Sequence, residues 1–218
     1  MQDHRKFNVI AFAISLAIGM SFALAVGIGL YFVILGKQTV SLDQPTAEDY
    51  VYQPTTAEAR LADNGGDGYI LIFGSVSCPH CRDLIVEDLP GIIERAPGKV
   101  VYRNVISPDF PVTALAQIML SCMPEEKRGP AVRKVYENQD ALFEESDRYV
   151  RDIFLESAGL DLEGKTADCL DDTSENRIMD LIDKHNEQRR IFDISATPTI
   201  VVDGETFVGR QDAESLGL

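Results

Sequence analysis

The sequence predicts an α/β fold, in which a sheet carries an inserted block of helices and follows an N-terminal transmembrane helix. Three observations lead to this prediction. Two apolar runs of strand length flank a helical pattern between residues 69 and 106. A long block of helical patterns comes next, and a second pair of apolar runs, joined by an Asp-Gly turn signal, follows it.

The first apolar run, Tyr69–Phe73, suits a central strand that is buried on both faces of a sheet. The second run is Val100–Ile106. Between them, apolar residues recur at helical spacing, namely Leu84, Ile85, Leu89, Ile92 and Ile93. A strand, a helix and a strand in this order predict a βαβ unit with parallel strands. Pro90 predicts a kink or break in the helix.

The block over residues 110–192 carries mostly helical patterns and is long enough to form an inserted helical subdomain. After it, Thr199–Val202 and Thr206–Gly209 are two short runs on either side of Asp203-Gly204. Asp-Gly between two apolar runs is a preferred two-residue turn, so this segment predicts a β-hairpin.

An uncharged apolar segment, Val9–Leu35, lies near the start of the sequence. A membrane-spanning helix needs about 20 such residues and the apolar core of a signal peptide about 7–15, so residues 1–36 predict an uncleaved signal anchor. His4, Arg5 and Lys6 come just before the segment. Because positive residues stay on the cytoplasmic side, the rest of the chain is expected outside, which in a bacterium is the periplasmic side of the inner membrane.

Cleavage at the small-residue site Ala23-Leu24-Ala25 is the competing interpretation, and it also exports residues 37–218. Residues 37–67 are polar, contain two prolines and end in a glycine-rich turn signal. They are interpreted as a linker that holds a domain over residues 68–218 away from the membrane, with room for a short edge strand around Tyr50–Tyr52.

Charge and cysteine content narrow the functional classes. The net charge of −15 argues against a nucleic-acid partner, because phosphate binding needs a positive surface. The four cysteines are one close pair, Cys78 and Cys81, and one distant pair, Cys122 and Cys169. This spacing fits two disulfides better than an all-cysteine zinc site, which needs a second short-spaced pair.

The close pair lies in the stretch GSVSCPHCRD, directly after the first strand and at the start of the predicted helix. Unpaired backbone N–H groups and the helix dipole there favour negative charge, so Cys78 should ionise more easily than a free cysteine. Cys81 is one turn away and close enough to bridge. Pro79 suits the first helical turn, and His80 adds a donor beside the thiolate. A stabilised thiolate is a good leaving group, so the disulfide form should accept electrons readily.

Three other roles compete with redox chemistry for this stretch. A structural disulfide in so tight a loop gives little entropic benefit. A heme attachment motif needs a histidine where Arg82 stands. A copper or zinc carrier could use Cys78, His80 and Cys81, but only His4 and His185 remain elsewhere to complete a site. Redox chemistry is therefore favoured, and no metal or other cofactor is expected.

The combination of Cys78-Pro79-His80-Cys81 after a buried strand, a helical insertion and then ATPTIVVDG from Ala196 resembles the DsbA family of thioredoxin-fold oxidoreductases, over roughly residues 45–218. The resemblance implies a thioredoxin fold in which Cys78 is the exposed, attacking sulfur and Cys81 the buried, resolving one. It also implies a cis peptide bond at Thr197-Pro198 that packs against the cysteine pair and leaves the Thr197 backbone free to bind an extended substrate.

The resemblance further implies that the protein introduces disulfides into exported proteins that carry cysteines, and that a partner in the membrane reoxidises the pair. Thr197 before the proline is also found in disulfide isomerases of the superfamily, so an isomerase or reductase is the alternative. Thioredoxin-fold proteins often carry a buried acid six residues before the first cysteine, where this chain has Ile72. Glu87 is one candidate for a replacement acid.

The distant pair suggests a structural disulfide, because a bond between Cys122 and Cys169 is plausible in an oxidising compartment. It would close a loop of roughly 48 residues and stabilise the fold by about 4 kcal/mol on the chain-entropy model. Two unpaired buried cysteines or a second redox relay remain alternatives at this point.

Overall fold

The computed structural model describes residues 50–55, 57–107, 109–144, 152–153, 156, 164–172 and 175–218. All of them belong to a compact unit over residues 45–218. The predicted transmembrane segment, Val9–Leu35, lies outside the described residues. Within the described part of the chain, the structure contains no helix with the length and apolar character needed to cross a membrane.

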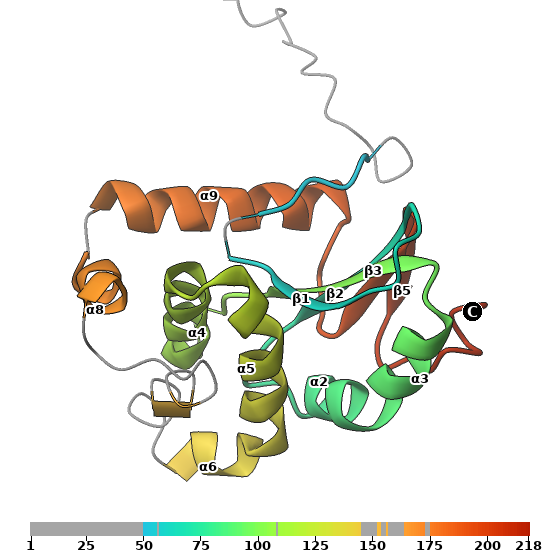
Figure 1. Ribbon diagram of the computed structural model, residues 1–218, viewed down its shortest axis with the longest axis horizontal. Helices are drawn as coiled ribbons and strands as arrows, with labels where there is room; N and C mark the ends of the chain where they lie inside the picture. The colour runs from blue at the N-terminus through green and yellow to red at the C-terminus, as the bar shows by residue number, and fades with distance from the viewer. Residues whose placement is uncertain are drawn as a thin grey trace, which may run out of the picture. The chain divides into compact units, whose positions relative to one another are not determined.

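A five-stranded mixed sheet forms the centre of the domain, with strand order β1-β3-β2-β4-β5 (Figure 1). The strands are β1 (Ala59–Asp63), β2 (Gly68–Gly74), β3 (Gly98–Asn104), β4 (Thr199–Val202) and β5 (Glu205–Val208). β2 and β3 are parallel neighbours, and the other pairs are antiparallel. The predicted βαβ unit, the central position of the first apolar run and the hairpin are all confirmed.

The turn of the hairpin shows why its sequence is Asp-Gly. Asp203 and Gly204 have φ angles of 46° and 96°. Two successive residues with positive φ form the turn that matches the twist of paired strands, and Asp and Gly tolerate this conformation best.

One nearly continuous helix follows β2, in the segments α2 (Pro79–Asp83), η1 (Leu84–Asp88) and α3 (Leu89–Arg95). Of the kink or break predicted at Pro90, the break does not occur, because the chain widens by a π-helical turn instead. The Leu89 N–H donates to the Leu84 carbonyl, five residues back, just before Pro90, whose nitrogen has no hydrogen to donate. The helix therefore passes the proline without ending.

The inserted helices lie between β3 and β4, as predicted. They are α4 (Pro111–Cys122), α5 (Glu125–Glu137), α6 (Gln139–Glu144), α8 (Gly164–Asp171) and α9 (Glu175–Ile191). Figure 1 shows α9 along one side of the sheet, with α2, α3 and α5 on the other side. The sheet is thus covered on both faces, which explains the unbroken apolar run in β2.

The segment predicted as a linker contributes a strand to the sheet. β1 pairs antiparallel with β3, whereas the edge strand was expected around Tyr50–Tyr52. Its sequence, ARLAD, has little strand propensity. Tertiary contacts hold it in place instead. Ala59 is fully buried, and α5 packs so closely against β1 that a Cβ on Gly129 would lie 2.2 Å from the Arg60 carbonyl oxygen.

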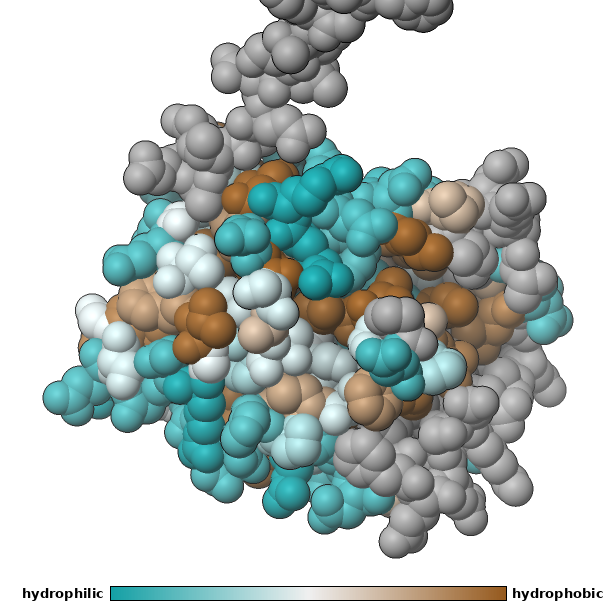
Figure 2. Space-filling model, turned by 180° about the vertical axis from the view of Figure 1, so that it is seen from behind, coloured by the Kyte–Doolittle hydropathy of each residue, from teal (hydrophilic) through white to brown (hydrophobic). Residues whose placement is uncertain are grey.

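The surface mixes polar and apolar areas. Figure 2 shows the side turned away in Figure 1, where brown apolar patches lie between larger hydrophilic areas. Single large apolar side chains are normal on a surface, and those most exposed among the described residues are Val51, Val86, Phe110, Met179 and Val208.

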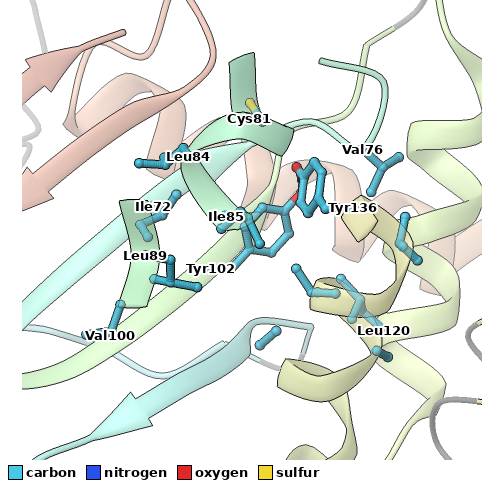
Figure 3. Packing of buried hydrophobic residues seen from close by; sticks show 14 of the residues in the cluster. Ile72, Val76, Cys81, Leu84, Ile85, Leu89, Val100, Tyr102, Leu120 and Tyr136 are labelled. Atoms are coloured by element: carbon cyan, nitrogen blue, oxygen red, sulfur yellow. Dashed lines mark hydrogen bonds between the residues drawn. The ribbon is translucent and has the colours of Figure 1, made fainter. Parts of the chain in front are cut away.

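The larger apolar core lies on the α2–α5 face and contains one of the paired cysteines. Cys81, Tyr102 and Tyr136 are fully buried in it, together with the apolar side of α2 and η1 (Figure 3). A smaller cluster on the opposite face includes Phe73 and Phe192. Cys81 is therefore part of a close-packed interior, whereas Cys78, three residues earlier, is only half-buried.

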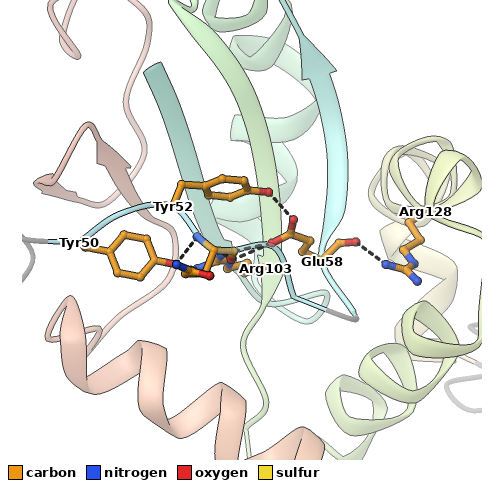
Figure 4. A network of polar contacts seen from close by, with 6 residues as sticks. Tyr50, Tyr52, Glu58, Arg103 and Arg128 are labelled. Atoms are coloured by element: carbon orange, nitrogen blue, oxygen red, sulfur yellow. Dashed lines mark hydrogen bonds and ion pairs between the residues drawn. The ribbon is translucent and has the colours of Figure 1, made fainter. Parts of the chain in front are cut away.

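A buried ion pair fastens the residues before β1 to the sheet (Figure 4). Arg103 of β3 and Glu58 have side chains that are 4% and 7% exposed, and an Arg103 Nη2 lies 3.1 Å from a Glu58 carboxylate oxygen. Arg103 also donates to the Tyr50 hydroxyl and the Gln53 carbonyl, while the Tyr52 hydroxyl donates to Glu58. A buried pair survives only when such extra hydrogen bonds satisfy it, so this stretch belongs to the folded domain.

Candidate active site

Cys78 lies at the N-terminal boundary of α2, where the sequence placed it. Its backbone is extended, with φ −93° and ψ 119°, and Pro79 is the first helical residue. The Cys78 carbonyl accepts the N–H groups of Cys81 at 3.1 Å and Arg82 at 3.2 Å, which starts the helix. His80 is exposed at the surface next to the pair.

The two thiols, both free in this structure, have opposite acidities. A hydrogen bond from the Cys81 thiol, then the Thr197 side chain and the N–H groups of Cys81 and His80, lower the pKa of Cys78 from 9.0 to about 5, against the opposing effect of burial. Burial, together with the hydrogen bond to Cys78 and its charge, raises the pKa of Cys81 far above its ordinary value. Cys78 is therefore a thiolate at neutral pH and Cys81 a thiol.

Thr197 and Pro198 lie against this pair, at the end of the loop before β4. Their peptide bond is cis, as the resemblance implies. The Cys78 Sγ is 3.3 Å from the Thr197 carbonyl oxygen, to which the protonated thiol donates. Pro198 is buried, and its carbonyl accepts the Gly209 N–H at 2.8 Å, so the hairpin holds this loop beside the cysteines.

A groove of about 440 Å³ opens beside Cys78. Its walls come from the ends of β2 and β3 and from the loop that contains Thr197. Arg189 of α9 is the charged side chain of the lining. Most of the contact surface is apolar, from Pro79, Val105, Ile106, Phe110, Ile194 and Ala196.

Sequence reasoning missed a residue that fixes the cysteine loop. Gln139 of α6 is 2% exposed, and its side-chain amide donates to the Val76 carbonyl at 2.8 Å and the Cys78 carbonyl at 3.0 Å. These two bonds attach the inserted helices to the redox pair. A lone glutamine in an acidic helical stretch carries no sequence signal for this contact.

The candidate acid Glu87 is directed away from the pair. Its carboxylate is exposed and forms an ion pair with Arg210 at 2.7 Å, in a cluster with Asp83 and Asp88. Tyr102 and Tyr136 belong to the same buried core cluster as Cys81, and their hydroxyl oxygens are 2.9 Å apart. Tyr136 lies in the predicted helical block and Tyr102 in the second predicted strand, but these patterns do not show that their hydroxyls meet.

The second cysteine pair is bonded. Cys122, the last residue of α4, forms a disulfide with Cys169 of α8, with Cα atoms 5.7 Å apart. It is separate from Cys78 and Cys81, which are the free cysteines. Across the described ranges, no group of three or more His, Cys, Asp or Glu side chains is arranged to hold a metal ion.

This fold and site define a thioredoxin-fold protein with a helical insertion and a CxxC pair at the start of a helix. A family model described as Thioredoxin matches residues 66–217, and the chain belongs to this family. Comparison with the curated proteins finds no match.

Solved structures similar to this chain include DsbA-like thiol–disulfide oxidoreductases. Alpha-DsbA1 of Wolbachia pipientis has a TM-score of 0.61 at 16% identity, covering 79% of this chain and 92% of its own. A protein-disulfide isomerase of Novosphingobium aromaticivorans has 0.57 at 18%, covering 74% and 94%. A periplasmic thioredoxin-like protein of Salmonella enterica serovar Typhimurium has 0.54 at 16%, covering 75% and 87%. At these identities the likeness establishes the shared fold.

Proposed function

We propose that this protein is a thiol–disulfide oxidoreductase that introduces disulfides into exported proteins by exchange through Cys78 and Cys81. The observation that carries the proposal is the unequal pair. Cys78 is half-buried, has a pKa of about 5 and borders a groove, whereas Cys81 is fully buried beneath it. Such a pair has one sulfur that clients reach and one that closes the ring.

The exchange balances in two steps. A client thiolate attacks Cys78 of the oxidised pair, which forms a mixed disulfide and releases Cys81 as a thiol after it takes up a proton. A second client thiolate then attacks the client sulfur of the mixed disulfide. The client leaves oxidised, and Cys78 leaves as a thiolate with the electron pair. The low pKa of Cys78 makes it a good leaving group in this second step.

The groove and the cis-proline loop supply the binding surface. An extended client segment can pair with the Thr197 backbone while apolar side chains next to its cysteine occupy the groove. Electrons from the client must then leave the pair, so we assign its reoxidation to a redox partner in the membrane. The predicted signal anchor on residues 1–36 would hold the domain on the periplasmic side of the inner membrane, near such a partner.

Disulfide isomerisation or reduction is the second candidate function. Thr197 favours it, and one similar structure is that of a protein-disulfide isomerase. The low pKa of Cys78 favours oxidation instead, because stabilising the reduced form makes the disulfide a stronger oxidant.

The reduction potential of the pair separates the two functions. We expect the oxidised chain, equilibrated with glutathione, to have a potential well above that of thioredoxin, which is about −270 mV. In parallel, the oxidised protein should restore activity to a reduced, disulfide-requiring enzyme. A potential near that of thioredoxin, with fast reduction of insulin, would assign the protein to the reductases.

A further inference from the structure

The groove beside Cys78 has a single permanently charged side chain in a mostly apolar wall. Among the described residues that line the groove, Arg189 in the last turn of α9 is the one Lys, Arg, Asp or Glu. Arg189 is partly buried. Partial removal from water strengthens the interaction of a charge with an opposite charge. A cation in this position therefore bears on which client segments the groove accepts.

The chain at the end of α9 fixes the position of Arg189. Asp193 follows the helix with a φ angle of 49°, a left-handed conformation that often ends a helix. Its N–H donates to the Arg190 carbonyl at 3.4 Å, and the Ile194 N–H donates to the Arg189 carbonyl at 2.8 Å. These are the two hydrogen bonds of a Schellman motif. The motif brings Ile194, which also lines the groove, next to Arg189.

The Arg189 guanidinium is held against this turn. Its Nε and Nη2 atoms donate to the Ile194 carbonyl at 3.2 Å and 3.1 Å. Because the guanidinium joins two residues of the lining, it belongs to the groove wall. A guanidinium has five N–H donors, so the donors on its outer edge, formed by Nη1 and Nη2, remain available. This edge matches the two oxygens of a carboxylate.

The outer edge of the guanidinium has no acidic partner in the part of the chain that the structure describes. There, no Asp or Glu forms an ion pair with Arg189, whereas Arg60, Arg103 and Arg210 each pair with at least one carboxylate. The side chain is thus charged, fixed at one end and able to bind an anion at the other.

We propose that Arg189 selects clients with an acidic side chain close to the reacting cysteine, and that its Nη1–Nη2 edge binds the client's Asp or Glu carboxylate. This inference rests on the proposed function and names the client segment that the groove prefers. Because Cys78 and Arg189 line the same groove, we expect the carboxylate within three residues of the client cysteine, which is about 10 Å of extended chain.

Matched peptide clients test the proposal with the full chain in its oxidised form. Each peptide carries two cysteines, and the two peptides of a pair differ only by Glu or Gln at one position within three residues of the first cysteine. The rate of oxidation by the protein is divided by the rate of the same peptide with hydroxyethyl disulfide. This uncharged reagent corrects for the effect of the carboxylate on the client thiol itself. We expect a corrected Glu/Gln ratio of about 5 to 10 at one position or more, as a charge-assisted hydrogen bond at a partly exposed site provides.

Variants of Arg189 assign this ratio to its side chain. Arg189→Gln should bring the ratio to about 1, and Arg189→Lys should retain part of it, because lysine keeps the charge without the planar fork. Arg190→Gln is the matched control and should keep the ratio. It removes the same charge from the same turn of α9, but Arg190 is exposed and is not among the described residues that line the groove.

A ratio near 1 at every position in the unchanged protein would overturn the proposal, and this measurement does not depend on the folding of any variant. The proposal also fails if Arg189→Gln slows both peptides of a pair equally and keeps the ratio, or if Arg190→Gln lowers the ratio as much as Arg189→Gln does. An unchanged protein that oxidises none of the peptides contradicts the proposed function and this inference together. Oxidation of the Glu and Gln peptides at equal corrected rates removes this inference alone.

Discussion

The two cysteine pairs of this chain have opposite environments. Cys78 and Cys81 lie on one turn at the start of a helix, and several hydrogen bonds favour the ionised form of Cys78. Cys122 and Cys169 are 47 residues apart, and their bond joins the end of α4 to α8. The first bond closes a loop of a few residues and the second a long one.

This difference shows what determines the role of a disulfide. A bond breaks easily where the reduced form is well stabilised, and Cys78 gains that stabilisation from the surrounding donors. A bond that closes a long loop restricts the unfolded chain and thereby stabilises the fold. We therefore assign the first pair to exchange and the second to stability, and the predictions below test this assignment.

The largest expected effect is on activity. Cys78→Ser should reduce exchange with a thiol client to the uncatalysed rate, because serine offers no sulfur for the mixed disulfide. The double variant Cys122→Ser/Cys169→Ser should keep the activity at temperatures where it remains folded. Oxidation of a fluorescent dithiol peptide by the oxidised protein compares the two variants directly, and comparable loss in both would reject the division of roles.

The next effect is on stability. Removing the Cys122–Cys169 bond should lower the free energy of unfolding by about 4 kcal/mol, the chain-entropy value for the 47-residue separation. Denaturant titration of Cys122→Ser/Cys169→Ser against the unchanged chain measures this difference. The single variant Cys122→Ser is the control, because it also breaks the bond and should lose a similar amount. A double variant as stable as the unchanged chain would remove the structural role.

Much of the fold and of the Cys78–Cys81 site could be predicted from the sequence, because the patterns that indicate them are local. The apolar run of β2, the Asp203-Gly204 turn and the helix after Cys78 follow from patterns within a few residues. The position of Cys78 at a helix start, and hence its acidity, follows from the same local pattern.

The remaining features depend on contacts between distant residues. β1 has a weak strand sequence and is held by pairing with β3. Gln139 lies 61 residues after Cys78, to whose carbonyl its side-chain amide donates. Sequence spacing alone carries no information on such contacts.

Gln139 offers a smaller effect, which tests how the cysteine loop is held. Gln139→Met keeps the side-chain length but leaves the Val76 and Cys78 carbonyls without this donor. We expect a loss of about 1–3 kcal/mol in the free energy of unfolding, measured by denaturant titration of the reduced chain. Gln188→Met is the matched control, since Gln188 of α9 is only partly buried and lines a different pocket. Equal losses in the two variants would mean that Gln139 does not fix the loop.

The smallest effect is a pH dependence that separates the two pairs. Cys78 has a pKa of about 5 in the folded protein and an ordinary value of 9.0. Between these values the unfolded chain binds the thiol proton and the folded chain does not, so the stability of the reduced protein rises with pH. One proton gives at most about 1.4 kcal/mol per pH unit, and the half-exposed sulfur should give less. Below pH 5 the contribution is lost.

Unfolding of the reduced Cys122→Ser/Cys169→Ser variant at pH 4.5, 6 and 7.5 measures this rise without interference from the second pair. Adding Cys78→Ser should remove the rise and leave the background from the carboxylates. A Cys81→Ser chain should retain part of it, because the Thr197 side chain and the helix N–H groups still favour the Cys78 thiolate. If stability rises equally with pH in the chains with and without Cys78, the fold does not stabilise the thiolate. The two cysteine pairs then differ only in the length of the loop that each bond closes.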